Sequence, residues 1–211
     1  MLVKARTESL ELRIYRALNL RMELPDDKKK YYHSIQKGFE GEVEFDLLTA
    51  TFECDCHVLN DLLFEVNNTK LQIDTLIIYQ DTIYLIEVKN NEGDYCYEGD
   101  SFKTKSGLEV KNPLDQLKRS TSLFRQLCQK LGSNLSVEPF VVFVNPSFTL
   151  YQAPKNLPFI FPTQLNTFIE KLNSKASKLN TWHSKFADQL VSLHIVESPY
   201  DRLPAYQYDQ L

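Results

Sequence analysis

The run that most constrains this chain is a short apolar strand that ends in two opposite charges, Ile83-Tyr84-Leu85-Ile86-Glu87-Val88-Lys89. Side chains two positions apart point to the same face of a strand. Glu87 and Lys89 should therefore project together, while the apolar residues next to them face the other way. Either charge is costly to bury alone. A strand that carries both is expected to pair them, to bind an ion or to take part in chemistry.

A second apolar run, residues 70–79, precedes this strand and carries an aspartate in its interior. A turn at residues 80–81 would join the two runs into a hairpin. Aspartate is depleted in strand interiors, and the hairpin would bring Asp74 across from the region of Glu87. Two carboxylates at one edge of a sheet, with Lys89 beside them, predict an oxygen-ligand site for a hard divalent cation.

Length and charge restrict the function classes. The chain has 211 residues and a net charge of −4. The negative charge argues against non-specific electrostatic binding of nucleic acid as the main function, but it leaves open an enzyme that acts on phosphodiesters. The first residues are charged, and the longest apolar stretch, residues 140–144, is far too short to cross a bilayer. We therefore expect a cytoplasmic protein that does not associate with membranes.

The cysteines offer an alternative metal site. Without a secretory signal, the four of them are expected to be reduced thiols. The segment Cys54-Asp55-Cys56-His57 could suggest zinc. Its spacing does not match a zinc knuckle, and no second pair of ligands follows at a suitable interval. Ordinary cysteines in a connection between a helix and a strand are the favoured interpretation.

Hydrophobic periodicity and capping signals divide the rest of the chain into helices and short strands. Pro25 ends the first helix and could begin another, and a loop at Gly38 leads into the next. Residues 90–107 are expected to form a loop or short edge hairpin beside the site, and no element is assigned to the tail from Ser198. The predicted helices cover residues 7–22, 39–48, 113–131, 164–173 and 176–194, and the predicted strands cover residues 57–66, 70–79, 83–89, 140–144 and 159–161.

One further carboxylate could reach the same edge of the sheet. Gly38 and Gly41 would let their helix approach the sheet closely, and Glu42 flanks the apolar stripe of that helix. Glu44 is a competing candidate and Glu40 a weaker one. A solvent-exposed helix acid is an equally good interpretation of Glu42.

Four sequence pieces occur in an order typical of a known family, and together they span about residues 36–145. The chain resembles the nuclease-related domain family, NERD, of the PD-(D/E)xK superfamily. Any one piece is weak evidence, but all four in this order, each on its expected element, are specific. The first acid of the superfamily often follows a proline, whereas Ile73 precedes Asp74 here. The pieces are Gly38-Phe39-Glu40-Gly41-Glu42, Gln72-Ile73-Asp74, Ile86-Glu87-Val88-Lys89-Asn90 and Asn112-Pro113-Leu114-Asp115-Gln116.

The resemblance implies an α/β fold of the restriction-endonuclease type, with a central mixed β-sheet flanked by helices and extra helices at both ends. We expect a single domain over residues 1–211. Within it, residues 36–172 would form the nuclease-like core, and residues 1–35 and 173–211 would form helical extensions. The terminal helices could also form a homodimer interface.

The resemblance also implies a metal-dependent nuclease that acts on nucleic acid, with DNA favoured over RNA. Asp74, Glu87 and the Val88 carbonyl would hold Mg²⁺ or Mn²⁺. Lys89 would orient or deprotonate the attacking water, or stabilise charge in the transition state. Glu42 would complete the site, and Gln116 would orient the nucleophile or hold a phosphate near the start of its helix.

Each of these residues also has an ordinary structural interpretation. Glu87 and Lys89 alone could form a surface ion pair, and Gln116 could be the polar flank of an amphipathic helix. A non-catalytic nucleic-acid-binding or assembly module is the alternative function. The aromatic residues Tyr95, Tyr97 and Phe102 are interpreted as loop packing rather than base-stacking groups. Basic residues that could contact a nucleic-acid backbone form only a loose group: Lys103, Lys105, Lys111, Lys118 and Arg119.

Overall fold

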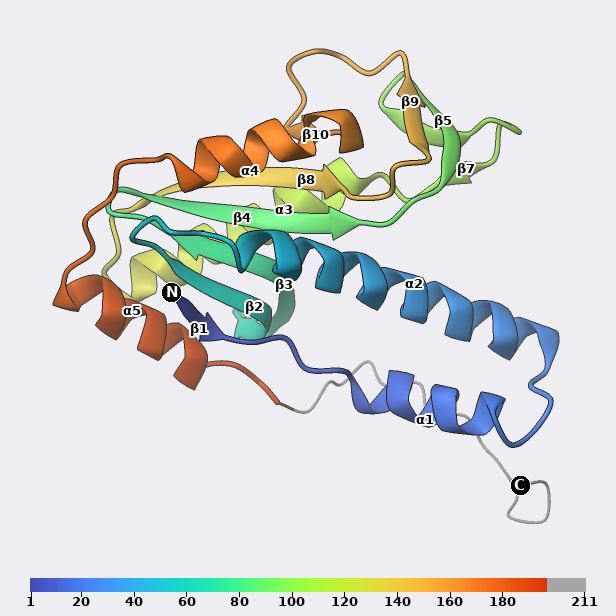
Figure 1. The fold of residues 1–211 in the computed structure, drawn as a ribbon, viewed down its shortest axis with the longest axis horizontal. Coiled ribbons are helices and arrows are strands. Elements are labelled where there is room, and N and C mark those ends of the chain that lie inside the picture. Colours follow the sequence, from blue (N-terminus) through green and yellow to red (C-terminus); the bar gives the residue numbers. More distant parts are fainter. Residues whose placement is uncertain (197–211) are drawn as a thin grey trace.

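A computed structural model describes residues 1–196, so the tail from Ser198 lies outside the described residues. The centre of the fold is a six-stranded mixed sheet in the order β1-β2-β3-β4-β8-β10 (Figure 1). The three middle strands β2, β3 and β4 pair antiparallel, and the other neighbours pair parallel. The strands are β1 (Leu2–Lys4), β2 (His57–Val66), β3 (Thr69–Ile78), β4 (Thr82–Lys89), β8 (Ser136–Phe143) and β10 (Phe159–Ile160).

Helices cover both faces of this sheet. On one face, α2 (Asp26–Thr49) and α4 (Leu165–Asn173), the latter preceded by the short helix η1 (Pro162–Gln164), pack on Ile86 and its neighbours. On the other face, α3 (Pro113–Lys130) and α5 (Thr181–Ser192) pack on Leu85 and its neighbours. Ile86 and Leu85 are consecutive, so β4 alternates as its sequence predicts. The fold is therefore the mixed α/β type that the sequence indicates.

A separate small cluster joins α1 (Leu10–Asn19) to the N-terminal half of α2, beyond the edge of the sheet (Figure 1). Leu12, Tyr15 and Leu18 from α1 pack there with Tyr32 from α2. The N-cap of α1 is Ser9, whose Oγ accepts a hydrogen bond from the Leu12 N–H at 3.2 Å. The apolar stripe of the first predicted helix thus packs against α2 and not against the sheet.

The predicted edge hairpin after β4 is part of a second sheet in the order β7-β6-β5-β9. Tyr95 and Phe102 from this hairpin pack against Phe148, which in turn stacks on Phe143 with ring centroids 4.1 Å apart. These contacts favour the packing interpretation of the two aromatic residues. The strands are β5 (Gly93–Glu98), β6 (Ser101–Thr104), β7 (Glu109–Val110) and β9 (Phe148–Tyr151).

Several predicted boundaries differ from the structure. The loop predicted at Gly38 is wrong, because α2 runs without a break through Gly38 and Gly41. Tertiary contact overrides the weak helix propensity of glycine here, since a Cβ on Gly41 would lie 2.6 Å from the Asn90 Cβ. The last helix begins at Thr181 rather than at residue 176, because Asn180 caps it. Strand β1 was not predicted.

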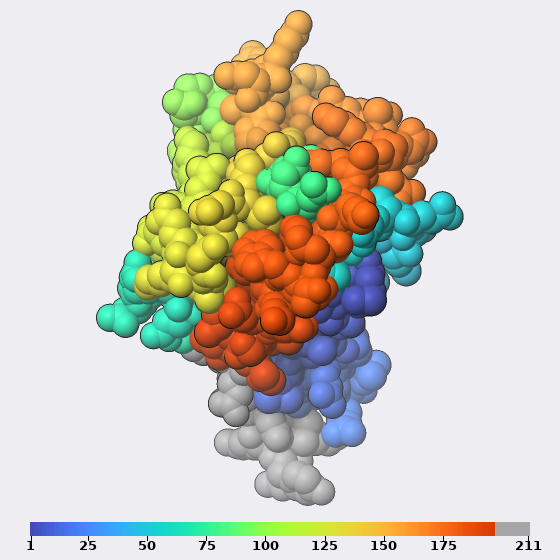
Figure 2. Space-filling view, turned by 90° about the vertical axis from the view of Figure 1, so that its left-hand side faces the viewer, coloured from blue at the N-terminus to red at the C-terminus, as the bar shows by residue number. Residues whose placement is uncertain are grey.

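The end of the sheet that holds the β3–β4 turn is enclosed by later parts of the chain. Figure 2 shows this green turn surrounded by the yellow α3–β8 region and the orange α4–α5 region. Gln80 accepts hydrogen bonds from Lys178 and from His183, and its N–H donates to Ser177. The opposite end of the same two strands is open and carries the candidate site. Within the described residues, no helix is both long and apolar enough to span a membrane.

Candidate active site

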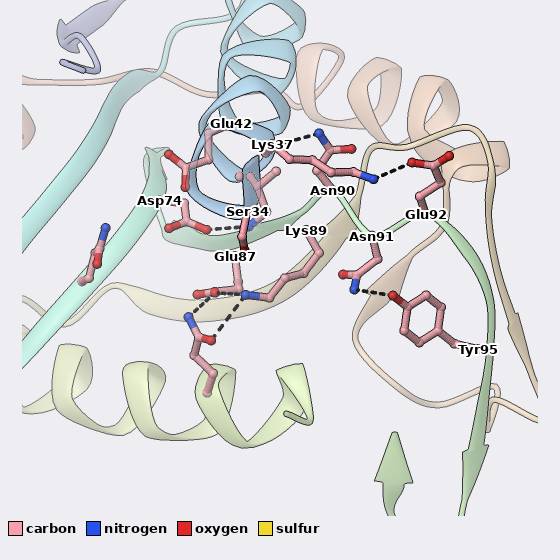
Figure 3. A pocket seen from close by; sticks show the side chains of 14 residues that line it. Ser34, Lys37, Glu42, Asp74, Glu87, Lys89, Asn90, Asn91, Glu92 and Tyr95 are labelled. Atoms are coloured by element: carbon pink, nitrogen blue, oxygen red, sulfur yellow. Dashed lines mark hydrogen bonds and ion pairs between the residues drawn. The ribbon is translucent and has the colours of Figure 1, made fainter. Parts of the chain in front are cut away.

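Asp74 and the end of β4 meet across the β3–β4 pair (Figure 3). The register pairs Thr75 with Ile86, which places Asp74 opposite Glu87 as the hairpin predicts. Asp74 Oδ2 accepts a hydrogen bond from the Val88 N–H at 2.7 Å. Asp74 and Glu87 expose only 7% and 2% of their surface, so both carboxyl groups are largely removed from water.

The alternation of side chains along β3 is irregular at Asp74. Ile73 and Leu76 are three positions apart, yet both belong to the apolar cluster under α3, so the alternation of faces is interrupted between them. The residue opposite Asp74 on β2 is Asp61, whose φ of +54° lies in the left-handed region. Asp74 therefore occupies a locally distorted part of the sheet, where its carboxyl group can bond the backbone of β4.

Glu87, Lys89 and Gln116 form a closed hydrogen-bonded group. Lys89 Nζ donates to Glu87 Oε1 at 2.7 Å and to Gln116 Oε1 at 3.3 Å. Gln116 Nε2 also donates to Glu87 Oε1. Gln116 lies in the first turn of α3, which Asn112 caps by accepting from the Leu114 N–H at 3.0 Å. Because Glu87 is buried, its pair with Lys89 differs from the exposed ion pair of the alternative interpretation.

Glu42 lines the same cavity from α2, whereas Glu40 and Glu44 do not line it. An arginine that sequence reasoning missed holds it there. Arg6 Nη1 donates to Glu42 Oε2 at 2.6 Å.

The same guanidinium group ties three elements together. Arg6 Nε and Nη2 donate to the two carboxylate oxygens of Asp46 at 2.9 and 3.1 Å. Nη2 also donates to the Asp74 carbonyl oxygen at 2.8 Å. The Arg6 side chain is only 4% exposed. Its partners lie 36 to 68 positions away along the chain, so no local sequence signal could have identified it.

The three carboxyl groups of the site hold their protons unusually tightly. Burial and the neighbouring Asp74 raise the pKa of Glu42 to about 8 and that of Glu87 to about 7. Burial also raises the pKa of Asp74, although Lys89 and the Val88 N–H oppose it. Burial lowers the pKa of Lys89, but Glu87 and Asp74 outweigh that effect and leave it raised. Loss of hydration is therefore the main cause of the raised carboxyl pKa values, and repulsion from Asp74 adds to it at Glu42 and Glu87.

The cavity around these residues has a volume of about 480 Å³. Its far wall comes from α2 and from the segment after β4, which the sequence predicted to lie beside the site (Figure 3). Lys37 pairs with Glu92 at 2.5 Å. Asn91 Nδ2 donates to the Tyr95 hydroxyl at 3.3 Å. The wall residues Ser34, Lys37, Asn90, Asn91, Glu92 and Tyr95 thus add amide and hydroxyl groups, with one neutralised charge pair.

The five basic candidates do not form one surface. Lys103 pairs with Glu98 at 3.5 Å and Lys105 pairs with Asp94 at 3.0 Å, both in the second sheet. Lys111 and Arg119 line a cavity beside the site. Lys118 lines a different cavity on the other side of α3.

The side chains of the segment Cys54–His57, the alternative metal site, do not converge on one point as zinc ligands would. Cys54 Sγ and Cys56 Sγ lie 3.6 Å apart, and His57 Nε2 lies 3.2 Å from Ser184 Oγ. All four cysteines are free thiols. Across residues 1–196, no three His, Cys, Asp or Glu side chains are grouped so that they could hold a metal ion by themselves.

A model of the nuclease-related domain matches residues 37–144, which is more than half of the chain. The chain belongs to the nuclease-related domain family. The NERD match runs from within α2 to just beyond β8, so it includes Glu42, Asp74, Glu87, Lys89 and Gln116. Arg6 lies outside the NERD match, two residues after the end of β1. No curated protein and no solved structure matches this chain.

Proposed function

We propose that this protein is a divalent-cation-dependent nuclease that hydrolyses phosphodiester bonds in nucleic acid, with DNA preferred over RNA. The observation that carries the proposal is the meeting of Asp74 and Glu87 on paired strands, with the Lys89 ammonium group bonded to Glu87 at the same cavity. Membership of the nuclease-related domain family supports the same class of reaction.

The donor set fits a hard cation. Asp74 and Glu87 offer two carboxylates, and the Val88 carbonyl adds a further oxygen beside them. Burial and mutual repulsion raise the pKa of Glu87, so a bound cation would relieve an existing cost. Mg²⁺ usually keeps several waters and is bound through one or two carboxylates, which is what this group provides. Bound Mg²⁺ or Mn²⁺ would supply Lewis acidity toward the phosphate and an acidified water.

The chain's own residues would orient the reacting groups. The Lys89 ammonium group donates to two acceptors, Glu87 and Gln116, and the neighbouring Glu87 and Asp74 raise its pKa, which favours its protonated form. Its role is therefore that of a donor, which orients the attacking water or stabilises negative charge on the phosphate. Gln116 fixes the position of Lys89. Glu42, held by Arg6, faces the same cavity and would accept a hydrogen bond from that water.

The test is cleavage of plasmid, linear duplex, single-stranded DNA and RNA in the presence of Mg²⁺ or Mn²⁺. We expect Asp74→Asn and Lys89→Met each to lower the rate at least about 10²-fold, because each removes a group that acts in the transition state. The matched control is Asp81→Asn, an isosteric change at the other end of the same hairpin, which should leave the rate unchanged.

The outcomes separate the two function classes. Metal-dependent cleavage that Asp74→Asn and Lys89→Met abolish would establish the nuclease, and the preferred substrate would identify DNA or RNA. Inert wild-type protein, or equal cleavage by all variants, would contradict the catalytic proposal. Binding of nucleic acid without cleavage would favour the non-catalytic binding module instead.

A further inference from the structure

A second cavity adjoins the candidate active site. Its volume is about 300 Å³, and it lies between the start of β3 and the first turns of α3. Gln72 and Gln116 line both this cavity and the larger one. Because Gln116 also bonds Glu87 and Lys89, the second cavity begins one side chain away from the candidate catalytic group.

The second cavity is lined mainly by positive charge. Lys70, Lys111 and Arg119 face it together with one acid, Asp115. Lys70 pairs with the exposed Glu65. Within residues 1–196, neither Lys111 nor Arg119 forms an ion pair at 4 Å or less. Two cations are thus free to bind an anion that enters this cavity.

The positive field of this cavity reaches the candidate active site. Lys111 is exposed and comes directly before Asn112, the N-cap of α3. It lines the second cavity together with Gln116, whose side chain bonds Glu87 and Lys89. A phosphate held by Lys111 would therefore lie within electrostatic reach of the reacting group.

The other cations near the site already have acidic partners. Lys37 pairs with Glu92 on the far wall, and Lys105 pairs with Asp94 in the second sheet. Lys118 has no ion pair within residues 1–196 either, but it faces the cavity on the other side of α3 and does not line the active-site cavity. Of the two cavities that Gln116 lines, only the second therefore has cations without an acidic partner among the described residues, namely Lys111 and Arg119.

We propose that Lys111 and Arg119, with Lys70, bind a backbone phosphate that flanks the scissile phosphodiester, and that Gln72 and Gln116 line the path between the two. This inference rests on the proposed nuclease function. A guanidinium group suits phosphate because it can donate two parallel hydrogen bonds. The nucleic-acid strand would cross the site from the basic cavity toward the amide-lined wall formed by Asn90 and Asn91.

The first test measures binding without cleavage, by fluorescence anisotropy of a labelled DNA 20-mer in EDTA. We expect Arg119→Ala and Lys111→Ala each to weaken binding about 5–10-fold and to lower the salt slope by about one. Lys118→Ala is the matched control, because it removes one exposed cation from the neighbouring position of the same helix. It should change affinity by less than about twofold. Equal weakening by Arg119→Ala and Lys118→Ala would overturn the proposal.

The second test compares substrates of different length. Bis(p-nitrophenyl) phosphate contains one phosphodiester and no flanking phosphate to occupy the basic cavity, so Arg119→Ala should hydrolyse it at the wild-type rate. With oligonucleotide substrate, the same variant should show a raised KM. Equal loss on both substrates would contradict a flanking-phosphate site. If wild-type protein cleaves neither substrate, the nuclease proposal fails, whereas the binding difference between Arg119→Ala and Lys118→Ala still decides the phosphate site.

Discussion

The two ends of the β3–β4 hairpin carry carboxylates in opposite electrostatic situations. At the enclosed end, Asp81 accepts from the Thr82 hydroxyl at 2.8 Å and pairs with Lys175 at 3.3 Å. The Thr82 hydrogen bond and Lys175 lower the pKa of Asp81 below its ordinary range. At the open end, burial and crowding raise the pKa of Asp74 and of Glu87.

The difference is the one expected between structural polar groups and the polar groups of a candidate active site. At the enclosed end, Gln80, Asp81 and Thr82 each have a hydrogen-bond or ion-pair partner, and Asp81 is exposed. At the open end, the buried carboxyl groups of Asp74 and Glu87 lie near the partly buried Glu42, which costs free energy of folding. Proteins keep such an arrangement where it serves a ligand or a reaction. The same hairpin thus provides its own structural control for the site.

The largest effect on stability should come from removing the buried cation of the open end. Arg6→Gln leaves Glu42 and Asp46 without their partner, so we expect the free energy of unfolding to fall by about 3–5 kcal/mol. Lys175→Gln, the matched change at the enclosed end, should cost only about 1 kcal/mol, because its partner Asp81 is exposed. Urea denaturation measures both. Equal losses would contradict the assignment of Arg6 as the residue that holds the open end together.

A smaller effect should distinguish two glycines of α2. A Cβ at position 41 would lie 2.6 Å from the Asn90 Cβ, so Gly41→Ala should destabilise the protein by about 1–3 kcal/mol. A Cβ at position 38 meets nothing within 4 Å, so Gly38→Ala should stabilise it by up to about 1 kcal/mol through helix propensity. Thermal unfolding of the two variants checks the close approach of α2 to the open end. A stabilising Gly41→Ala would disprove that approach.

The smallest effect concerns pH. The folded protein holds a proton on Glu42 up to a pKa of about 8, whereas an unfolded glutamate is ionised above about pH 5. The folded state therefore binds more protons, and the free energy of unfolding should fall by about 1 kcal/mol between pH 7 and 8 in EDTA. Burial lowers the pKa of His57 and of His194, which adds the opposite slope only below this window.

Glu42→Gln is the control for that slope, because it removes the titrating group and keeps the shape of the side chain. We expect the stability of this variant to fall by less than half as much between pH 7 and 8, because Glu87, whose pKa is raised to about 7, still loses part of its proton in this window. If wild-type protein and Glu42→Gln lose stability in parallel, Glu42 is not the group that holds the proton.

Local patterns made part of the site predictable from the sequence. Strand alternation placed Glu87 beside Lys89, and a short turn placed Asp74 opposite them. These two inferences need only neighbouring residues. A capped helix start placed Gln116 in the first turn of its helix, but only the resemblance to the nuclease-related domain assigned it to the site. The role of Arg6 could not be predicted in this way, because its partners come from α2 and β3, far along the chain.

The parts of the fold that were mispredicted share that cause. Strand β9 joins the second sheet by pairing parallel with β5, about 55 residues earlier, so its own sequence does not reveal its neighbour. Helix α2 continues through Gly38 and Gly41 because Asn90 packs against it, which outweighs glycine's poor helix propensity. The division of the basic residues between two sides of α3 likewise depends on which neighbours each side meets.

The central claim is that the open end of the hairpin binds a divalent cation, and Mn²⁺ binding tests it most directly. Isothermal titration calorimetry and electron paramagnetic resonance would compare wild-type protein with Asp74→Asn and Asp81→Asn. We expect one Mn²⁺ site in wild-type protein, at least about tenfold weaker binding in Asp74→Asn, and unchanged binding in Asp81→Asn. Absent binding in wild-type protein, or equal affinity in all three, would contradict the claim.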